Sequence, residues 1–424
     1  MGIPYYVASL IRAHKHIERK CNHGPVEVDV LGIDFNCFIH RYLEDDNPIG
    51  SIMLALDDLL TRVVRAKRVY LAFDGLVPYA KMVQQRYRRM MQPGNGTGFD
   101  RQQISPGTPY MKELAKTIEI MFRDIVVSDT LEPGEGEHKI FQWLQRLPKK
   151  DRKDICIYGL DADLVLISIA QSHLGNIQVL REVDEENHFS VISIQGLMQV
   201  LPIDPQRFVE MSVLCFGNDF MPTIGMFSLR RDGYNRAIYF AERNDAAQQE
   251  KKVFLKHAKD SDRRIVAKDA HALETRFGVQ CMDGVLDWEP VVYAFWKTYA
   301  WTLHYFQTSE VLDWKWYYPY PEAPLMETID AYDHKYEFTW EHPTVDYTVE
   351  DQLQFILPEY SLQKVGLPSI HPDEFYNEET DKRYPWMKQF LWESKPYVSL
   401  PFEGLTRISE FVPRQPELPH ADSS

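Results

Sequence analysis

The chain has 424 residues, 44% hydrophobic and 26% charged, which exceeds one ordinary domain and excludes a mainly disordered chain. Its net charge of −15 argues against a general polybasic attraction to nucleic acid. The N-terminus lacks the order of a signal peptide, and no uninterrupted apolar segment of 18 residues occurs. The cysteines are odd in number and form no C-x-x-C pair, which argues against a disulfide framework or a structural zinc site: Cys21, Cys37, Cys156, Cys215 and Cys281. We therefore expect a soluble protein of a reducing compartment.

Three apolar segments predict buried parallel strands. They read VEVDVLGIDF, RVYLAFDG and ICIYGLDAD, and each has an aspartate at or near its end. Segments with helical periodicity, 51–66 and 137–147, separate them. We therefore expect an α/β fold with a mostly parallel central sheet and flanking helices. In such sheets ligands bind beyond the carboxyl ends of the strands, where these aspartates lie.

The composition changes after about residue 240. The following segment is charged and poor in large apolar residues, as in an exposed helical connector, and an aromatic-rich region comes after it. The last residues are polar and contain proline, which is typical of a loosely ordered tail. We expect four parts: a core over 1–240, a connector over 241–283, a smaller, mainly helical region over 284–412 and a tail over 413–424.

Basic residues concentrate between residues 62 and 89. This stretch carries a net charge of +7 while the rest carries −22, which favours a local anion site. Within it Lys81, Gln85, Arg88 and Arg89 are spaced to share one helix face about 100° wide. Guanidinium and amide groups on one face can donate several hydrogen bonds to a phosphate. A solvated basic helix face explains the same spacing.

Seven acidic residues stand at predicted strand ends and turns: Asp34, Asp74, Glu135, Glu137, Asp161, Asp163 and Asp219. If they converge they repel, at a cost of several kcal/mol for a pair about 4 Å apart, so cations must neutralise them. Their ligand atoms are all oxygens and no His/Cys cluster accompanies them, which indicates Mg²⁺ or Mn²⁺. Two such ions about 3.5–4 Å apart suit phosphodiester hydrolysis. Each acid alone also fits a helix N-cap or an exposed turn.

Segments over most of the chain carry a resemblance to a known family. They read MGIPYY, IDFNCFIH, LAFDGLVPYAKMVQQRYRR, ISPGTPYM, EPGEGEHKI, YGLDADLVLISIA, VLRE and CFGNDFMP. After the connector come WTLHYFQTSEVLDWKWYYPYPEAPL, EDQLQFILPEYS and YVSLPFEGLTRI. The sequence resembles the Xrn-type 5′→3′ exoribonucleases, relatives of the flap endonucleases, and the later segments resemble the family's second conserved region. The resemblance implies a core like that of PIN domains and flap nucleases.

The resemblance also implies roles for individual residues. The seven acids match the family's metal-binding set, which holds two Mg²⁺ ions that Mn²⁺ can replace. Lys81, Gln85, Arg88 and Arg89 match the residues that hold a 5′-monophosphate. His40 matches a histidine that stacks on the first base, with an aromatic residue of the second region opposite. Trp301, Trp314 and Trp316 are the candidates for that residue, and we favour Trp301.

Three departures from the family pattern stand out. An acidic pair usually precedes the GND element, whereas here the nearest acid is Glu210. The position after DG-x-x-P that is usually basic is Tyr79. The large C-terminal accessory region of cytoplasmic members is not seen, so we expect a minimal catalytic core whose processivity and protein partners cannot be carried over.

We interpret the chain as a Mg²⁺-dependent 5′→3′ exoribonuclease that hydrolyses 5′-monophosphorylated single-stranded RNA to 5′-mononucleotides. We expect a monomer in the cytoplasm without membrane contact, while a nuclear location and a viral origin stay open. One alternative is a structure-specific flap endonuclease acting on DNA, against which AKMVQQRYRR and the second region argue. Another is a non-catalytic RNA-binding scaffold, against which the full set of seven acids argues.

Overall fold

The structure is a computed structural model that describes residues 2–3, 5–21, 24–90, 99–183, 188–224, 227, 229, 233–243, 289–318, 323–324, 326–332 and 336–368. Nearly all of the predicted connector, the segment YVSLPFEGLTRI and the predicted tail lie outside these residues. Within them no helix is long and apolar enough to cross a membrane.

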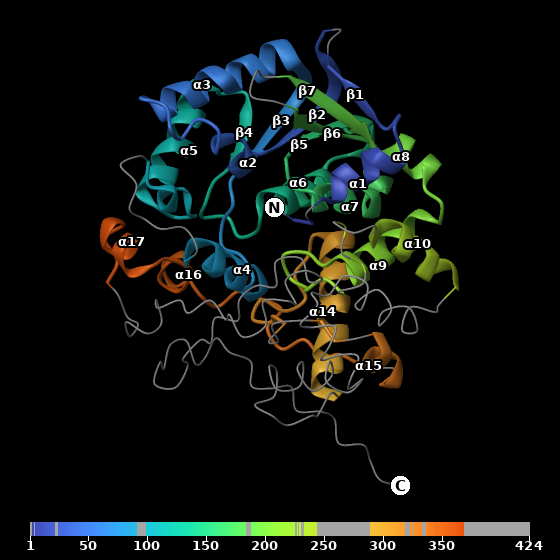
Figure 1. Cartoon of the computed structure of the whole chain (residues 1–424). Helices are drawn as coiled ribbons and strands as arrows, with labels where there is room; N and C mark the ends of the chain where they lie inside the picture. The colour runs from blue at the N-terminus through green and yellow to red at the C-terminus, as the bar shows by residue number, and fades with distance from the viewer. Residues whose placement is uncertain are drawn as a thin grey trace, which may run out of the picture.

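Seven strands of the described residues form one mixed sheet in the order β1-β7-β6-β5-β2-β3-β4 (Figure 1). Strands β2 to β6 run parallel, while β7 pairs antiparallel with β6 and with β1. This confirms the predicted α/β fold with a mostly parallel sheet. The strands are β1 (Glu18–Lys20), β2 (Val26–Asp34), β3 (Val64–Ala72), β4 (Ile125–Ser128), β5 (Asp154–Tyr158), β6 (Asn176–Glu182) and β7 (Phe189–Ser193).

The register of the central strands brings their carboxyl ends together. Asp34 of β2 pairs with Ala72 of β3, and Ile33 pairs with Tyr158 of β5. Most of β2 is buried, as expected for a central parallel strand covered on both faces. The residues that follow β2, β3 and β5 therefore meet at one edge of the sheet.

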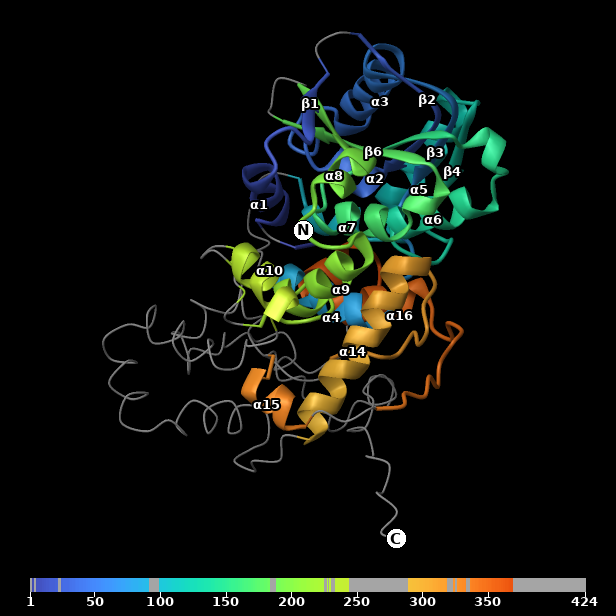
Figure 2. The same cartoon turned by 90° about the vertical axis from the view of Figure 1, so that its right-hand side faces the viewer.

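Helices cover both faces of the sheet (Figures 1 and 2). Apolar residues of α2, α3 and α5 form a cluster with one face, and those of α1, α6, α7 and α8 form a second cluster on the other. The helices are α1 (Tyr6–Ala13), α2 (Phe35–Ile39), α3 (Pro48–Asp58), α4 (Tyr79–Met90), α5 (Pro109–Met121), α6 (Gly136–Arg146), α7 (Asp163–Ala170), α8 (Ile194–Val200), α9 (Pro205–Phe216) and α10 (Gly233–Arg243).

The two predicted helices differ from the structure only at their ends. The helix expected over 137–147 is α6, displaced by one residue. The helix expected over 51–66 starts earlier, at Pro48, and ends in a π-helical turn, Leu59–Val63, after which Val64 enters β3. Val64 pairs with Val26 of β2, and β-branched valines suit a buried strand better than a helix end.

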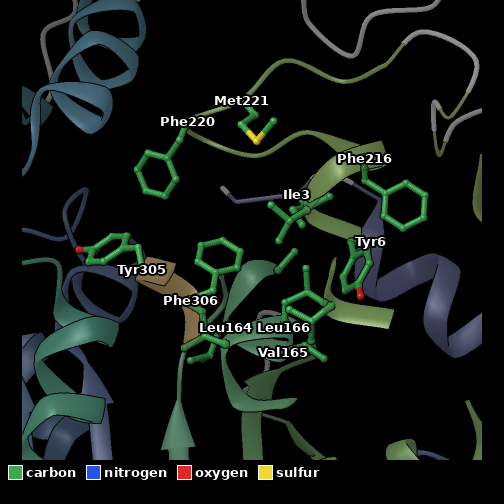
Figure 3. Packing of buried hydrophobic residues seen from close by; sticks show 14 of the residues in the cluster. Ile3, Tyr6, Leu164, Val165, Leu166, Phe216, Phe220, Met221, Tyr305 and Phe306 are labelled. Atoms are coloured by element: carbon green, nitrogen blue, oxygen red, sulfur yellow. The ribbon is translucent and has the colours of Figure 1, made fainter. Parts of the chain in front are cut away.

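The second region adds α14 (Glu289–Thr308), α15 (Met326–Ala331), α16 (Val349–Ile356) and α17 (Glu359–Lys364). Helix α14 contacts α7 and α9, and α16 contacts α4. Tyr305 and Phe306 of α14 lie near Phe220 of the first region (Figure 3), with ring centroids 5.8 and 6.4 Å from that of Phe220. Both regions thus contribute to one hydrophobic cluster. The boundaries at 240, 283 and 412 stay predictions.

Candidate metal centre

Five carboxylates meet where β2, β3 and β5 end. Asp34 closes β2, Asp74 lies just beyond β3, Asp161 and Asp163 follow β5, and Glu137 lies in the first turn of α6. Oxygens of Asp34, Asp74 and Glu137 lie within 4.8 Å of one another, and so do those of Glu137, Asp161 and Asp163. The structure therefore brings together five of the predicted acids as two three-carboxylate groups that share Glu137.

The PGEGE loop can place Glu137 there because its glycines permit close approach. A Cβ atom on Gly136 would lie 2.8 Å from Oδ1 of Asp34, and Gly134 has a φ of +117° that L side chains rarely adopt. The amide of Gly136 donates to Oδ1 of Asp74 at 2.8 Å. Gly134 also exchanges backbone hydrogen bonds with the loop after β3, through Gly75 and Leu76. The motif therefore fastens the start of α6 to the segment that carries Asp74.

Helix α2 supplies two further contacts to the acids. The amide of Asp74 donates to Oδ1 of Asn36 at 3.1 Å, and the thiol of Cys37 donates to Oδ2 of Asp34 at 2.8 Å. Burial, then the negative charge of Asp34, raises the pKa of Cys37 well above its usual value, which keeps it a thiol donor. Nothing in the sequence spacing pointed to these two positions, except that both lie within three residues of Asp34.

The other two predicted acids, Glu135 and Asp219, lie outside the three-carboxylate groups and share one cation. The ammonium of Lys81 lies 2.5 Å from Oε2 of Glu135 and 2.8 Å from Oδ2 of Asp219, and all three side chains are buried. The amide of Gln84 also donates to Oδ1 of Asp219, at 3.0 Å. The hydroxyl of Tyr305 donates to Oε1 of Glu135 at 3.2 Å.

Burial and like charges raise the pKa values of two carboxyls of the centre. Burial, followed by the charges of Asp74 and Asp161, raises the pKa of Asp34 to about 8. Burial and the charges of Asp161 and Asp219 raise the pKa of Asp163 to about 7. Burial alone would lower the pKa of Lys81, but Asp219 and Glu135 outweigh it and raise that pKa well above its usual value. The charge of Lys81 therefore does not offset the effects that raise the pKa values of Asp34 and Asp163.

A divalent cation fits this site. Oδ1 of Asp34 and Oδ1 of Asp163 are buried and accept no hydrogen bond from the described residues. Buried carboxylate oxygens are costly unless paired with a donor or a metal. Because both three-carboxylate groups offer only oxygens, they suit a hard divalent ion. Which residues ligate the ions stays a prediction.

The structure describes the side chains of three of the four residues predicted to hold a 5′-phosphate. Lys81 faces Glu135 and Asp219, while Gln85 is buried and its Oε1 accepts no hydrogen bond from the described residues. Arg89 donates to the carbonyl of Arg101 at 3.1 Å. The side chain of Arg88 lies outside the described residues. The pocket stays a prediction.

The two predicted stacking residues differ in exposure. His40, which follows α2, is exposed. Trp301 is fully buried, and its Nε1 donates to the carbonyl of Asp313 at 2.9 Å. Among the alternatives Trp316 is buried and Trp314 is half-buried. The stacking role of Trp301 stays a prediction that would require its ring to be uncovered.

Two features of the basic stretch could not be predicted from its composition. Arg62, Arg65, Lys67 and Arg68 lie in the turn before β3 and in the first half of β3, and each pairs with an acid. The local anion site stays a prediction for the rest of the stretch. Tyr79 is buried against Tyr347 of the second region, with ring centroids 4.9 Å apart. A buried aromatic residue thus stands at the position that is usually basic in the family.

The sequence matches a family described as "XRN 5'-3' exonuclease N-terminus" over residues 1–97 and 92–183. It is 31% identical over 282 residues to 5'-3' exoribonuclease 1 of Saccharomyces cerevisiae, covering 49% of this chain and 18% of that protein. It is 30% identical over 220 residues to 5'-3' exoribonuclease 2 of Gallus gallus, covering 40% of this chain and 23% of that protein. The chain thus matches about a fifth of the length of these relatives.

Among solved structures, the catalytic core of Rad2 in complex with a DNA substrate is similar at 16% identity and a TM-score of 0.41, over 85% of this chain and 96% of that one. The family match contains Asp34, Asp74, Glu137, Asp161 and Asp163, so the five carboxylates of the two groups all fall within it. Over its first 183 residues, which include these five carboxylates, the chain is thus similar to the N-terminal part of the Xrn-type 5′-3′ exonucleases.

Proposed function

We propose that the protein is a 5′→3′ exoribonuclease that hydrolyses single-stranded RNA with a 5′-monophosphate to 5′-mononucleotides. The observation that carries the proposal is the pair of three-carboxylate groups sharing Glu137, in residues that match the exonuclease family. The named relatives are 5′-3′ exoribonucleases, which supports RNA as the substrate.

We further propose Mg²⁺ as the natural ion, with Mn²⁺ able to replace it. Oxygen-only ligands favour these ions over zinc. Two divalent ions bound here would supply an activated water and stabilise the leaving oxygen of the phosphodiester. Asp34 and Asp74 would hold one ion, Asp161 and Asp163 the other, and Glu137 would contact both. Lys81 keeps Glu135 and Asp219 paired, which reduces the negative charge that the phosphate backbone must approach.

The experiment is a degradation assay on one RNA prepared with a 5′-monophosphate, a 5′-hydroxyl or a 5′-triphosphate. We expect mononucleotides from the monophosphate RNA in Mg²⁺ or Mn²⁺, no turnover in EDTA, and binding without turnover in Ca²⁺, which holds its ligands in looser geometry. A labelled flap DNA tests the main alternative, because a released oligonucleotide would identify a flap endonuclease. RNA binding without products from any substrate would identify a scaffold.

The preference for a 5′-monophosphate is tested at helix α4. If Arg88 binds the terminal phosphate, Arg88→Ala should lose about ten- to a hundredfold in kcat/KM on monophosphate RNA, since a charged hydrogen bond contributes roughly 1.5–3 kcal/mol. The same variant should be nearly unchanged on 5′-hydroxyl RNA. An equal loss on both substrates would show that the helix contacts the RNA backbone generally.

A further inference from the structure

The C-terminal half of α14 reaches the acidic centre through Tyr305. This side chain is fully buried, and its hydroxyl donates to Oε1 of Glu135 at 3.2 Å. The other oxygen of Glu135, Oε2, lies 2.5 Å from the ammonium of Lys81. The Glu135 carboxylate is thus held from both sides, by one donor on each oxygen.

The ring of Tyr305 is itself fixed by its neighbours. It stacks on the imidazole of His138 of α6, with centroids 3.6 Å apart and planes 17° apart. It also meets Phe220 in a T-shaped contact at 5.8 Å (Figure 3). Because the ring contacts both α6 and the loop that follows Asp219, its hydroxyl has little freedom to leave Glu135.

The residue that follows α14 secures this contact. Ser309 is buried with a φ of +60°, and its hydroxyl lies 3.1 Å from Nδ1 of His138 and accepts from the amide of Gln171 at 2.8 Å. Its carbonyl accepts from the amide of Gln142 at 2.6 Å. A non-glycine residue held at positive φ persists only where surrounding contacts demand it. The end of α14 is therefore docked on α6 and α7 by polar contacts as well as by apolar packing.

We propose that Tyr305 is a positioning residue of the metal centre, supplied by the second region. Glu135 is two residues from Glu137, which both three-carboxylate groups share. The orientation of the Glu135 carboxylate therefore determines how its negative charge is placed relative to these two groups. Groups that hold metal-ligating carboxylates commonly control metal affinity and activity by 10–100-fold, and Glu135 is one of the seven acids of the predicted metal-binding set. The second region thereby shapes the metal site in addition to extending the hydrophobic core.

The test is Tyr305→Phe, which removes the hydroxyl and keeps the ring on His138. We expect Mn²⁺ binding to the RNA-free protein, followed by electron paramagnetic resonance, to weaken about tenfold. With RNA, kcat should fall about ten- to a hundredfold while KM stays within about twofold, and excess Mg²⁺ should restore part of the rate. Tyr299→Phe on the same helix is the matched control, since Tyr299 contacts the ring of Trp296, and should behave as wild type.

Three outcomes would overturn the proposal: unchanged Mn²⁺ affinity and kcat in Tyr305→Phe, an equal loss in Tyr299→Phe, or a larger loss in Ser309→Ala than in Tyr305→Phe. Ser309→Ala removes a partner of His138 but keeps the Tyr305 hydroxyl, so it should lose less. The activity measurement rests on the proposed function, whereas Mn²⁺ binding does not. A wild-type protein that binds Mn²⁺ but degrades no RNA would refute the proposed function and leave the role of Tyr305 to be decided by Mn²⁺ binding alone.

Discussion

The two ends of the central strands arrange their charges in opposite ways. Near the amino ends, basic residues of β3 pair one to one with acids: Arg65 with Glu27, Lys67 with Asp29 and Arg68 with Asp151, at 3.8, 2.7 and 3.3 Å. Beyond the carboxyl ends, five of the predicted acids form the two three-carboxylate groups, and the other two, Glu135 and Asp219, share the buried ammonium of Lys81.

The two ends therefore differ in local charge balance: the charges are paired on the surface at the amino ends, and buried acids cluster at the functional site beyond the carboxyl ends. The paired residues of β3 are mostly exposed, and exposed ion pairs contribute little to stability. The carboxyl end instead keeps buried carboxylates with raised pKa values, such as Asp34 and Asp163. An arrangement this costly is typical of functional sites, where perturbed titratable groups cluster.

The largest expected effect comes from Glu137→Gln, which removes the carboxylate that both groups share. We expect nuclease activity to fall at least about a thousandfold, or about 4 kcal/mol of transition-state stabilisation, with the protein still folded. Stability without metal should hold or rise, because like-charge repulsion decreases. Glu27→Gln, at the amino end, is the control and should keep normal turnover. Near-normal turnover of Glu137→Gln in Mg²⁺ would contradict the two-group assignment.

Replacing the buried ammonium should give the next largest effect. Lys81→Met leaves Glu135 and Asp219 without a counter-charge, and breaking a buried pair costs about 3–5 kcal/mol. Chemical denaturation of the metal-free protein measures this loss, and Mg²⁺ should restore part of it. Lys67→Met, whose partner Asp29 lies at the exposed amino end, should leave the denaturation midpoint unchanged. Equal losses in the two variants would remove the contrast between the two ends.

Site residues could be predicted from the sequence where an acidic residue directly follows a predicted strand. An apolar run that ends in aspartate predicts a carboxylate at the edge of a parallel sheet, and the residues Asp34, Asp74 and Asp161 do lie there. The same reasoning treated residues 62–89 as one basic unit, because composition does not show where a strand begins. Register with β2 places Arg65 and Lys67 at the far end from Asp74.

Contacts between distant segments could not be predicted from local patterns. The helical spacing around Lys81 is correct, but its pairing with Glu135 and Asp219 depends on how α4, α6 and the loop after α9 pack. Tyr305 reaches Glu135 across 170 residues of sequence. An aromatic residue in an apolar helix gives no sign that its hydroxyl faces a carboxylate.

The raised pKa values predict that metal binding releases protons. Asp34 and Asp163, with pKa values of about 8 and about 7, are partly protonated near neutral pH and must lose those protons to bind a cation. Affinity for Mn²⁺ should therefore rise between pH 6 and 8, by up to about tenfold per pH unit for each proton released. Calorimetry in two buffers of different ionisation enthalpy measures the release directly. Asp29, near the amino ends of the strands, is the control, because the hydrogen bond from Lys67 lowers its pKa and keeps it ionised. Asp29→Asn should therefore not change the number of protons released on metal binding.

The smallest expected effect tests how the second region supports the loop that follows the carboxyl end of β3. Gln352 of α16 is fully buried, its Oε1 accepts from the amide of Val77 at 2.8 Å, and its Nε2 donates to the carbonyl of Gly75 at 3.4 Å. These contacts hold the loop between Asp74 and α4.

Gln352→Leu keeps the volume but leaves the amide of Val77 without its acceptor, so we expect a loss of roughly 1–2 kcal/mol in the free energy of unfolding. Mn²⁺ affinity should fall only a few-fold, because the neighbouring amide of Gly136 still donates to Asp74. Gln363→Leu, at an exposed position of α17, is the matched control and should change neither quantity. If Gln352→Leu left both stability and Mn²⁺ affinity unchanged, the loop would be positioned by the PGEGE contacts alone, and support from the second region would be confined to α14.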